Sequence, residues 1–240
     1  MTKYSEMIIK HLFFILLLCF SQFAFSQNSG YSQKKEYGLN GNVKSVTTYM
    51  VDVSKYRIPT DTLNYSGKTY MTFNKNGDVI LYNRSYNLPD YNYVSKSIFK
   101  GSGKNISYEE DYWLNDFPKE HLKYQFVWTR DLEYKITSVN DKTNTVRFIS
   151  LNKDFTVDKV IFKRDSYTSE EKTTYTYNEN VLEKVALNLT VTENEETKTS
   201  EDIRIVKSVD IYNNPTVFHF FKSVNSRVPT TVLFKYYEYY

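Results

Sequence analysis

The chain has 240 residues, of which 40% are hydrophobic, 25% are charged and 17% are aromatic. This composition is typical of a globular protein with unusually many aromatic residues, and it excludes a disordered or collagen-like chain. The formal net charge of +3 is too small to indicate nucleic acid or an anionic membrane as a partner. No motif in the sequence fixes a molecular activity.

The amino terminus has the features of a secretory signal peptide. Lys10 supplies a positive charge, Leu12–Phe20 is an unbroken apolar run, and Ala24-Phe25-Ser26 offers small residues for cleavage. The apolar run is too short for a transmembrane helix, which needs about 20 residues. We therefore predict export to the periplasm or the cell exterior, with no transmembrane span after signal cleavage.

Cys19, the single cysteine, lies within that apolar run and is expected to leave with the signal. The exported chain then has no disulfide, so its stability must come from its core. We predict a signal peptide at residues 1–26, a flexible leader at 27–36 and a single all-β repeat domain at 37–240.

Most of the sequence after Tyr37 alternates between apolar and polar residues, as in Leu122, Tyr124, Phe126 and Trp128. A period of two is typical of strands with one buried face. We predict about a dozen strands joined by short polar connections. The predicted fold is all-β, an antiparallel meander of repeated β-hairpins that forms an open, curved or rolled sheet.

The first hairpins repeat with an offset of 26 residues. A short internal repeat indicates repeated supersecondary units. The residues of the first copy are Phe73, Asn76, Gly77, Ile80 and Tyr82, and those of the second copy are Phe99, Gly103, Ile106 and Tyr108.

Asn76-Gly77 suits a two-residue type I′ turn, in which both residues have positive φ. Such a turn places Phe73 opposite Ile80 and Met71 opposite Tyr82, and a turn at Ser102-Gly103 places Phe99 opposite Ile106. Each hairpin then has one hydrophobic face, and several hairpins must pack together to bury it.

The segment Phe73-Asn74-Lys75-Asn76-Gly77-Asp78-Val79 resembles the tyrosine-aspartate (YD) repeats of RHS-type bacterial surface proteins and related small exported proteins. Gly38–Val46 resembles the opening segment of such proteins. The resemblance implies an exported, all-β surface or periplasmic protein without catalysis of its own. Asn replaces the Asp of the family pattern, and no glycine follows Gly103.

Metal and cofactor chemistry lacks the residues that it needs. Only His121 and His219 follow the signal, and no cysteine accompanies them, which excludes zinc, haem and iron–sulfur sites built from His and Cys clusters. No G-x-S-x-G motif is present. We expect no enzyme activity, no metal and no cofactor, and we expect His219 to be half-buried beside Val217 and Phe221.

Acidic runs could suggest a glycosidase, whose chemistry needs two facing carboxyl groups. Adjacent strand residues point to opposite faces, so these runs do not form such pairs by themselves. Glu110 is unusual because it shares the apolar face of Ile106 and Tyr108, and we expect a bend, a bulge or a sheet edge there. The runs are Glu109-Glu110-Asp111, Glu170-Glu171 and Glu193-Asn194-Glu195-Glu196.

Three aromatic residues are candidate binding residues because the alternation places them on the solvent-exposed face. Trp113 alternates with the acidic residues of its strand, and Tyr237 and Tyr239 oppose a face formed by Val232, Phe234 and Tyr236. Exposed rings can stack on sugars or anchor a partner protein. The alternative is that these rings cover a neighbouring loop or pack in a second sheet layer.

We expect a non-enzymatic exported envelope or cell-surface protein with a binding or structural role, whose partner is an envelope protein or a polysaccharide. One alternative is a glycan-binding accessory protein that uses the exposed aromatic residues. Two further alternatives are a carboxylate-based hydrolase and an outer-membrane β-barrel, although Glu238 interrupts the apolar face of the last strand.

Overall fold

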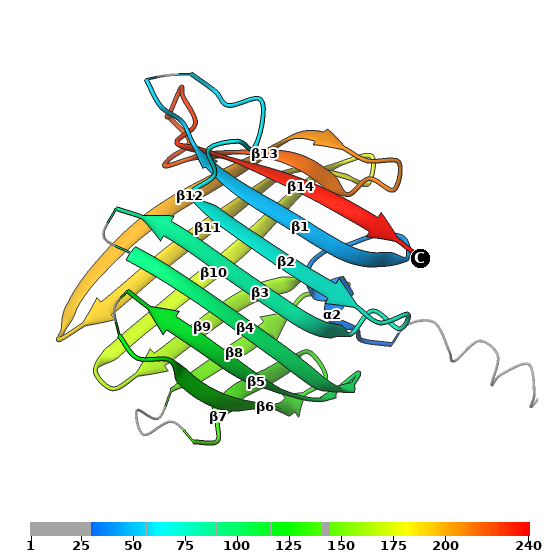
Figure 1. Cartoon of the computed structure of the whole chain (residues 1–240), viewed down its shortest axis with the longest axis vertical. Helices are drawn as coiled ribbons and strands as arrows, with labels where there is room; N and C mark the ends of the chain where they lie inside the picture. Colours follow the sequence, from blue (N-terminus) through cyan, green and yellow to red (C-terminus); the bar gives the residue numbers. More distant parts are fainter. Residues whose placement is uncertain (1–29, 56, 90, 116, 141–144) are drawn as a thin grey trace, which may run out of the picture. The chain divides into compact units, whose positions relative to one another are not determined.

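The computed structural model describes residues 30–240 except 56, 90, 116 and 141–144, so the predicted signal peptide lies outside the described residues. Residues 32–240 form one compact unit, a closed antiparallel barrel (Figure 1). One short helix, α2 (Gln33–Glu36), precedes the strands. The strands are β1 (Val43–Asp52), β2 (Gly67–Phe73), β3 (Val79–Leu88), β4 (Tyr91–Ser102), β5 (Asn105–Leu114), β6 (Glu120–Arg130), β7 (Glu133–Ser138), β8 (Val146–Leu151), β9 (Val157–Arg164), β10 (Tyr167–Asn178), β11 (Val181–Glu193), β12 (Glu196–Val209), β13 (Pro215–Phe221) and β14 (Thr231–Tyr239).

The strands follow one another in sequence order around the barrel, which closes where β14 pairs with β1. The predicted all-β antiparallel meander is confirmed, but the predicted open sheet is wrong. Closure depends on residues far apart in the chain: Ser45 Oγ donates a hydrogen bond to Glu238 Oε2 at 3.0 Å. Pairing of the first and last strands leaves no open sheet edge.

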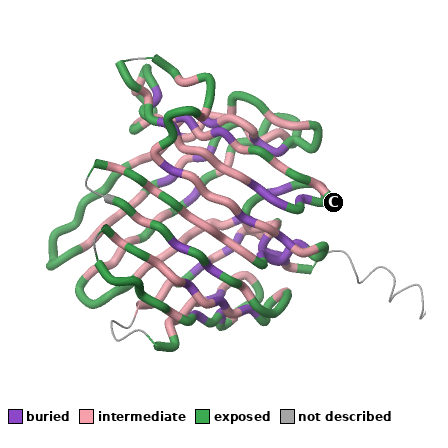
Figure 2. Tube along the Cα trace, viewed as in Figure 1, coloured by how far each residue is buried: buried purple, intermediate pink, exposed green. Residues whose placement is uncertain are grey.

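Each strand has one side toward the barrel interior and one side toward solvent, as the period of two predicts (Figure 2). In β4, Ser95 and Ser97 are buried, whereas Val94, Lys96 and Ile98 are exposed. The register continues this division across the neighbouring strands, since Ser97 pairs with the inward Tyr82 and Glu110.

The outer face of the barrel is rich in charged residues. This polarity gives the barrel wall a water-compatible surface. The outward-facing charged residues on β4–β7 and β9–β11 include Lys96, Lys100, Glu109, Asp111, Lys123, Lys135, Lys159, Lys163, Glu170, Lys172 and Lys184.

Three connections at one end of the barrel share a five-residue turn. The N–H of the first residue donates to the carbonyl of the fifth at 2.8 to 2.9 Å, and the N–H of the fourth donates to the carbonyl of the first at 2.9 to 3.1 Å. The fourth residue has positive φ in each turn, and the side chain of the fifth is buried. The three turns are Asn74–Asp78, Asn152–Thr156 and Asp210–Asn214.

This turn corrects the predicted hairpin registers. Met71 faces Tyr82 as predicted, but a bulge after the five-residue turn places Phe73 opposite Val79, and Ile80 lies outside with 45% of its surface exposed. In the second hairpin the turn residues are Gly103 and Lys104. Phe99 therefore faces Tyr108, and Ile106 faces Gly101.

Residues 32–40, which we name the plug segment, contact all three of these turns. Lys34 N donates to Gly77 O at 2.8 Å, the Lys35 ammonium lies 5.2 Å from the centre of the Phe155 ring, and Asn40 N donates to the Asn214 side chain at 2.7 Å. Residues 32–36 are therefore held by the barrel, whereas the sequence analysis assigns them to a flexible leader.

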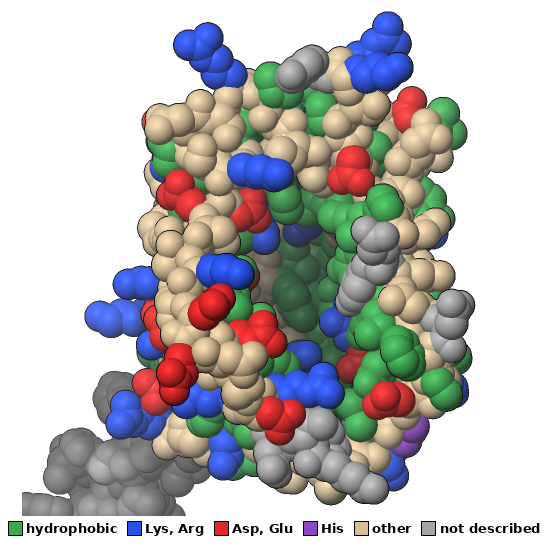
Figure 3. Space-filling model, turned by 90° about the vertical axis from the view of Figure 1, so that its left-hand side faces the viewer, with side chains coloured by type: hydrophobic (Ala, Val, Ile, Leu, Met, Phe, Trp, Pro, Cys, Tyr) green, Lys and Arg blue, Asp and Glu red, His purple; other side chains and the backbone are tan. Residues whose placement is uncertain are grey.

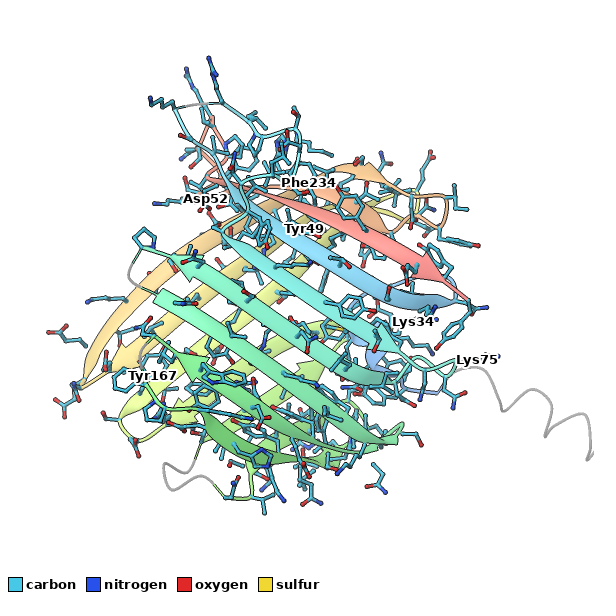
Figure 4. The ribbon with its side chains drawn as sticks, in the orientation of Figure 1. Lys34, Tyr49, Asp52, Lys75, Tyr167 and Phe234 are labelled. Carbon is cyan, nitrogen blue, oxygen red and sulfur yellow. The ribbon has the colours of Figure 1, made fainter. Side chains whose placement is uncertain are left out.

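An apolar cluster lies on the outer side of the barrel wall, where β1 and β14 run side by side. Val51, Val232 and Phe234 are buried there, and Val53 of the following connection packs against them. Figure 4 shows Tyr49, Asp52 and Phe234 in this region, while Lys34 and Tyr167 lie toward opposite ends of the barrel. No helix in the described part of the chain is long and apolar enough to cross a membrane.

Candidate functional site in the barrel interior

The barrel is hollowed at the end that lies away from α2. Figure 3 shows this face, with hydrophobic side chains lining the hollow and Lys, Arg, Asp and Glu side chains around it. The hollow therefore presents a concave surface that is partly apolar. Such a concave apolar surface is the usual setting of a small-molecule site.

Aromatic rings from β4–β7 pack across neighbouring strands on the inner face. Tyr108 stacks on Phe99 with 4.8 Å between the ring centroids and on Tyr124 with 4.6 Å. Farther along, Phe126 stacks on Tyr134 at 5.1 Å. Phe99, Tyr108 and Tyr124 stand on paired positions of adjacent strands, and Tyr134 lies diagonal to Phe126, since it pairs with Trp128. The alternation of the sequence therefore places these rings on one inner surface.

An ion pair lies among these rings. Arg84 of β3 bonds to Glu110 of β5, whose side chain is 4% exposed, and Tyr93 OH donates to the same carboxylate oxygen at 3.0 Å. The guanidinium also lies over the rings of Tyr82 and Tyr93. Burial lowers the pKa of Arg84, but Glu110 and nearby tyrosines oppose this effect and leave the pKa above its usual value.

The position of Glu110 corrects the expectation of a bend, a bulge or a sheet edge. Its pairing with Ser97 and Leu122 is regular on both sides, so its side chain enters the interior and is neutralised by Arg84. Glu109 and Asp111 point outward instead. A hydrogen bond from Lys100 lowers the pKa of Glu109, and hydrogen bonds from Lys119 and His121 lower that of Asp111.

Tyr37 of the plug segment separates two interior cavities and lines both of them. Its ring packs edge-on against Phe73 at 6.3 Å. The smaller cavity, of about 120 Å³, lies beside Arg84, Tyr108 and Arg147. The larger cavity, of about 400 Å³, lies between the plug segment and the ends of β10–β14.

The larger cavity is lined by aromatic and polar side chains, and one of the polar ones is an inward-facing lysine of β14. Tyr175, Phe218 and Tyr237 contribute rings, and Lys235 of β14 contributes an ammonium group that lies 5.2 Å from the centre of the Phe218 ring. Burial, followed by the charge of Arg204, lowers the pKa of Lys235 to about 8. The cavity therefore offers a cation beside aromatic rings.

Trp113 lies outside the barrel, as the alternation predicts. It is 39% exposed, and the Lys119 ammonium lies 5.1 Å from the centre of its ring. It borders an outer groove of about 660 Å³ together with Tyr49, Tyr70 and Asn83. The side-chain oxygen of Asn83 is buried and accepts no hydrogen bond from the described residues.

Tyr237 and Tyr239 lie inside the barrel, which corrects their predicted place on the solvent-exposed face. Tyr237 OH donates to Pro215 O at 2.7 Å, and Tyr239 OH donates to the Asp210 carboxylate. The face of Val232 and Phe234 points outward instead. The structure therefore separates Trp113 from the two tyrosines by the barrel wall.

His219 is half-buried on the outer face, where it pairs with Val232, and burial lowers its pKa. Among the described residues, no cluster of three or more His, Cys, Asp or Glu side chains could hold a metal ion.

Sequence reasoning missed the cations that face the interior, among them Arg84 and Lys235. A signal for Arg84 was present in the sequence, because Arg84 stands between Tyr82 and Tyr86 on the apolar face of its strand. Glu110 stands in the same way between Tyr108 and Tyr112. No comparable signal marked Lys235, because aromatic residues occur on both faces of its strand.

No family model matches the chain, and neither a curated protein nor a solved structure is significantly similar to it.

Proposed function

We propose that this chain is a non-enzymatic binding protein that holds a small apolar or amphiphilic molecule inside its barrel. The predicted export to the periplasm or cell exterior, and a resemblance to YD repeats, remain part of this proposal. An exported carrier would hold such a molecule away from water in its interior.

The observation that carries the proposal is that the barrel encloses two cavities lined in part by aromatic rings. Charged residues on seven strands face outward, and the barrel is hollowed at one end, where hydrophobic side chains line the hollow. Outward charges on so many strands are costly against lipid, which favours an aqueous exterior. An apolar ligand would therefore gain most by entering the interior.

A neutral fluorescent probe, N-phenyl-1-naphthylamine, tests this proposal. We expect the purified chain to bind the probe with saturation and with increased fluorescence. Leu182→Trp, which fills part of the larger cavity, should weaken binding by about tenfold. Val127→Trp adds the same ring to the outer face and should leave binding unchanged. Absence of saturable binding, or equal effects of both variants, would contradict the proposal.

A glycan-binding role is a second candidate, supported by the outer groove beside Trp113. The groove joins the exposed Trp113 ring and the half-buried Tyr49 and Tyr70 rings to a buried Asn83 oxygen that accepts no hydrogen bond from the described residues. Stacking plus a few polar contacts is a common mode of recognition. A glycan array compares the original chain with Trp113→Ala and with Val127→Ala as an outer-face control. Glycan binding that only Trp113→Ala removes would support this role, and binding that survives would contradict it.

A further inference from the structure

The larger cavity holds a cation whose charge the protein does not neutralise. Lys235 points inward from β14 and lines the cavity beside Phe218 and Tyr237. Within the described residues, no carboxylate oxygen lies within 4 Å of its ammonium group. Lys235 is half-buried, and a charge that is withdrawn from water without a counter-ion is unfavourable, because the lost hydration is not replaced.

Arg204 on β12 is a cation of the same region that has a counter-ion. Its guanidinium stacks over Phe220 at 4.6 Å, and its Nε lies 3.2 Å from the Asp202 carboxylate. Lys235 stacks in a similar way over Phe218, two residues earlier on β13, but lacks such a partner.

The charged side chains that line the cavity are two lysines and one aspartate, Lys35, Lys235 and Asp154. Asp154 is engaged within its own turn, where its Oδ1 accepts hydrogen bonds from Thr156 N at 3.1 Å and from Thr156 Oγ1 at 2.7 Å. The cavity therefore has an excess of positive charge, and the acid that it contains already has donors.

We infer that the larger cavity binds a small apolar molecule with one anionic head group, such as a carboxylate, and that Lys235 is the residue that binds this group. This inference rests on the proposed interior binding and specifies its ligand class. The head group would replace the missing counter-ion, and a charge-assisted hydrogen bond forms best where water is excluded. The apolar body would lie against Tyr175, Phe218 and Tyr237.

The test uses two probes that differ by one anionic group, the neutral N-phenyl-1-naphthylamine and its sulfonate, 1-anilinonaphthalene-8-sulfonate. Dissociation constants are measured by fluorescence titration at pH 7 for the original chain, Lys235→Met and Lys235→Arg. Lys172→Met is the matched control, because Lys172 is exposed on the outer face of β10.

We expect Lys235→Met to weaken binding of the sulfonate by about tenfold and to leave binding of the neutral probe within about twofold. Lys235→Arg, which keeps the charge, and Lys172→Met should retain both affinities. If both proteins bind the neutral probe and also bind the sulfonate with equal affinity, the role of Lys235 would be overturned, but the proposed function would stand. Failure of both probes to bind would instead overturn the proposed function.

A competition experiment needs no variant and so does not depend on how Lys235→Met folds. Octanoate and 1-octanol, which share a chain length, compete with the neutral probe bound to the original chain. We expect octanoate to displace the probe at a lower concentration than the alcohol. Equal displacement by both would overturn the inferred preference for an anionic head group.

Discussion

Arg84 and Glu110 form an ion pair inside the barrel although β4 separates their strands. The Arg84 side chain crosses β4 beside Ser95, whose Oγ accepts a hydrogen bond from Arg84 Nε at 3.0 Å. A small serine on the intervening strand leaves room for the guanidinium. The pair therefore joins three consecutive strands through side chains as well as through backbone hydrogen bonds.

Removal of the Glu110 charge should destabilise the barrel. Glu110→Gln leaves the Arg84 guanidinium largely buried without a counter-ion, which typically lowers the free energy of unfolding by about 3 kcal/mol. Glu109→Gln is the control, because this neighbouring acid is paired with Lys100 on the outer face, where solvent screens the pair and it contributes little to stability. Urea unfolding measures both changes, and similar effects of the two variants would contradict the assignment.

Gly77 should be less tolerant of substitution than Gly103, although both have positive φ. A Cβ on Gly77 would lie 3.1 Å from Lys34 Cβ and from Ser32 Oγ, whereas a Cβ on Gly103 would contact nothing within 4 Å. Both alanine variants incur backbone strain of about 1 kcal/mol, but only Gly77→Ala should also displace the plug segment. Hydrogen exchange of the Lys34 amide, which bonds to Gly77 O, should accelerate in Gly77→Ala alone.

The sequence predicted the strands and their inner faces well where one face is clearly apolar. In β6, Tyr124 and Phe126 are buried and alternate with Lys123 and Gln125, which are exposed, as the period of two requires. The same alternation accounts for the outward position of Trp113. It also accounts for the acidic run, in which Glu110 points inward and Glu109 and Asp111 point outward.

The faces of β14 could not be predicted, because both carry aromatic residues. Part of its outer face is buried, since Val232 and Phe234 pack against Val51 and Val53, whereas Tyr236 contacts Tyr49 and stays exposed. Barrel closure was equally hidden, since β1 and β14 have no local turn to reveal their pairing. The cavity around Lys235 depends on both features, so no short-range pattern could have located it.

Asn214 is fully buried and joins the last turn to the plug segment and to β14. Its side chain accepts from Asn40 N at 2.7 Å and donates to Asn40 O and to Tyr239 OH. Asn214→Ala leaves several buried polar groups unpaired, so we expect the free energy of unfolding to fall by about 3 kcal/mol. Asn188→Ala, at an exposed position of β11, should change it by less than about 0.5 kcal/mol. Equal unfolding midpoints would refute this role.

The titration of Lys235 should make the free energy of unfolding rise between about pH 8 and about pH 10. Its pKa is about 8 in the folded barrel and near the ordinary 10.5 in the unfolded chain, so within this window the unfolded chain binds more protons. Unfolding then becomes less favourable as pH rises. Below pH 8 both states are protonated, and the penalty of the buried charge is constant.

The expected gain from pH 7.5 to pH 9.5 is about 2 kcal/mol relative to Lys235→Met, which lacks the titrating group. Burial raises the pKa values of the nearby Tyr37, Tyr175, Tyr177 and Tyr237 above the ordinary tyrosine value. All other groups around the cavity are present in both proteins, so the comparison isolates Lys235. Urea unfolding at the two pH values measures the difference, and a difference that does not change with pH would show that Lys235 is not held in a desolvated site.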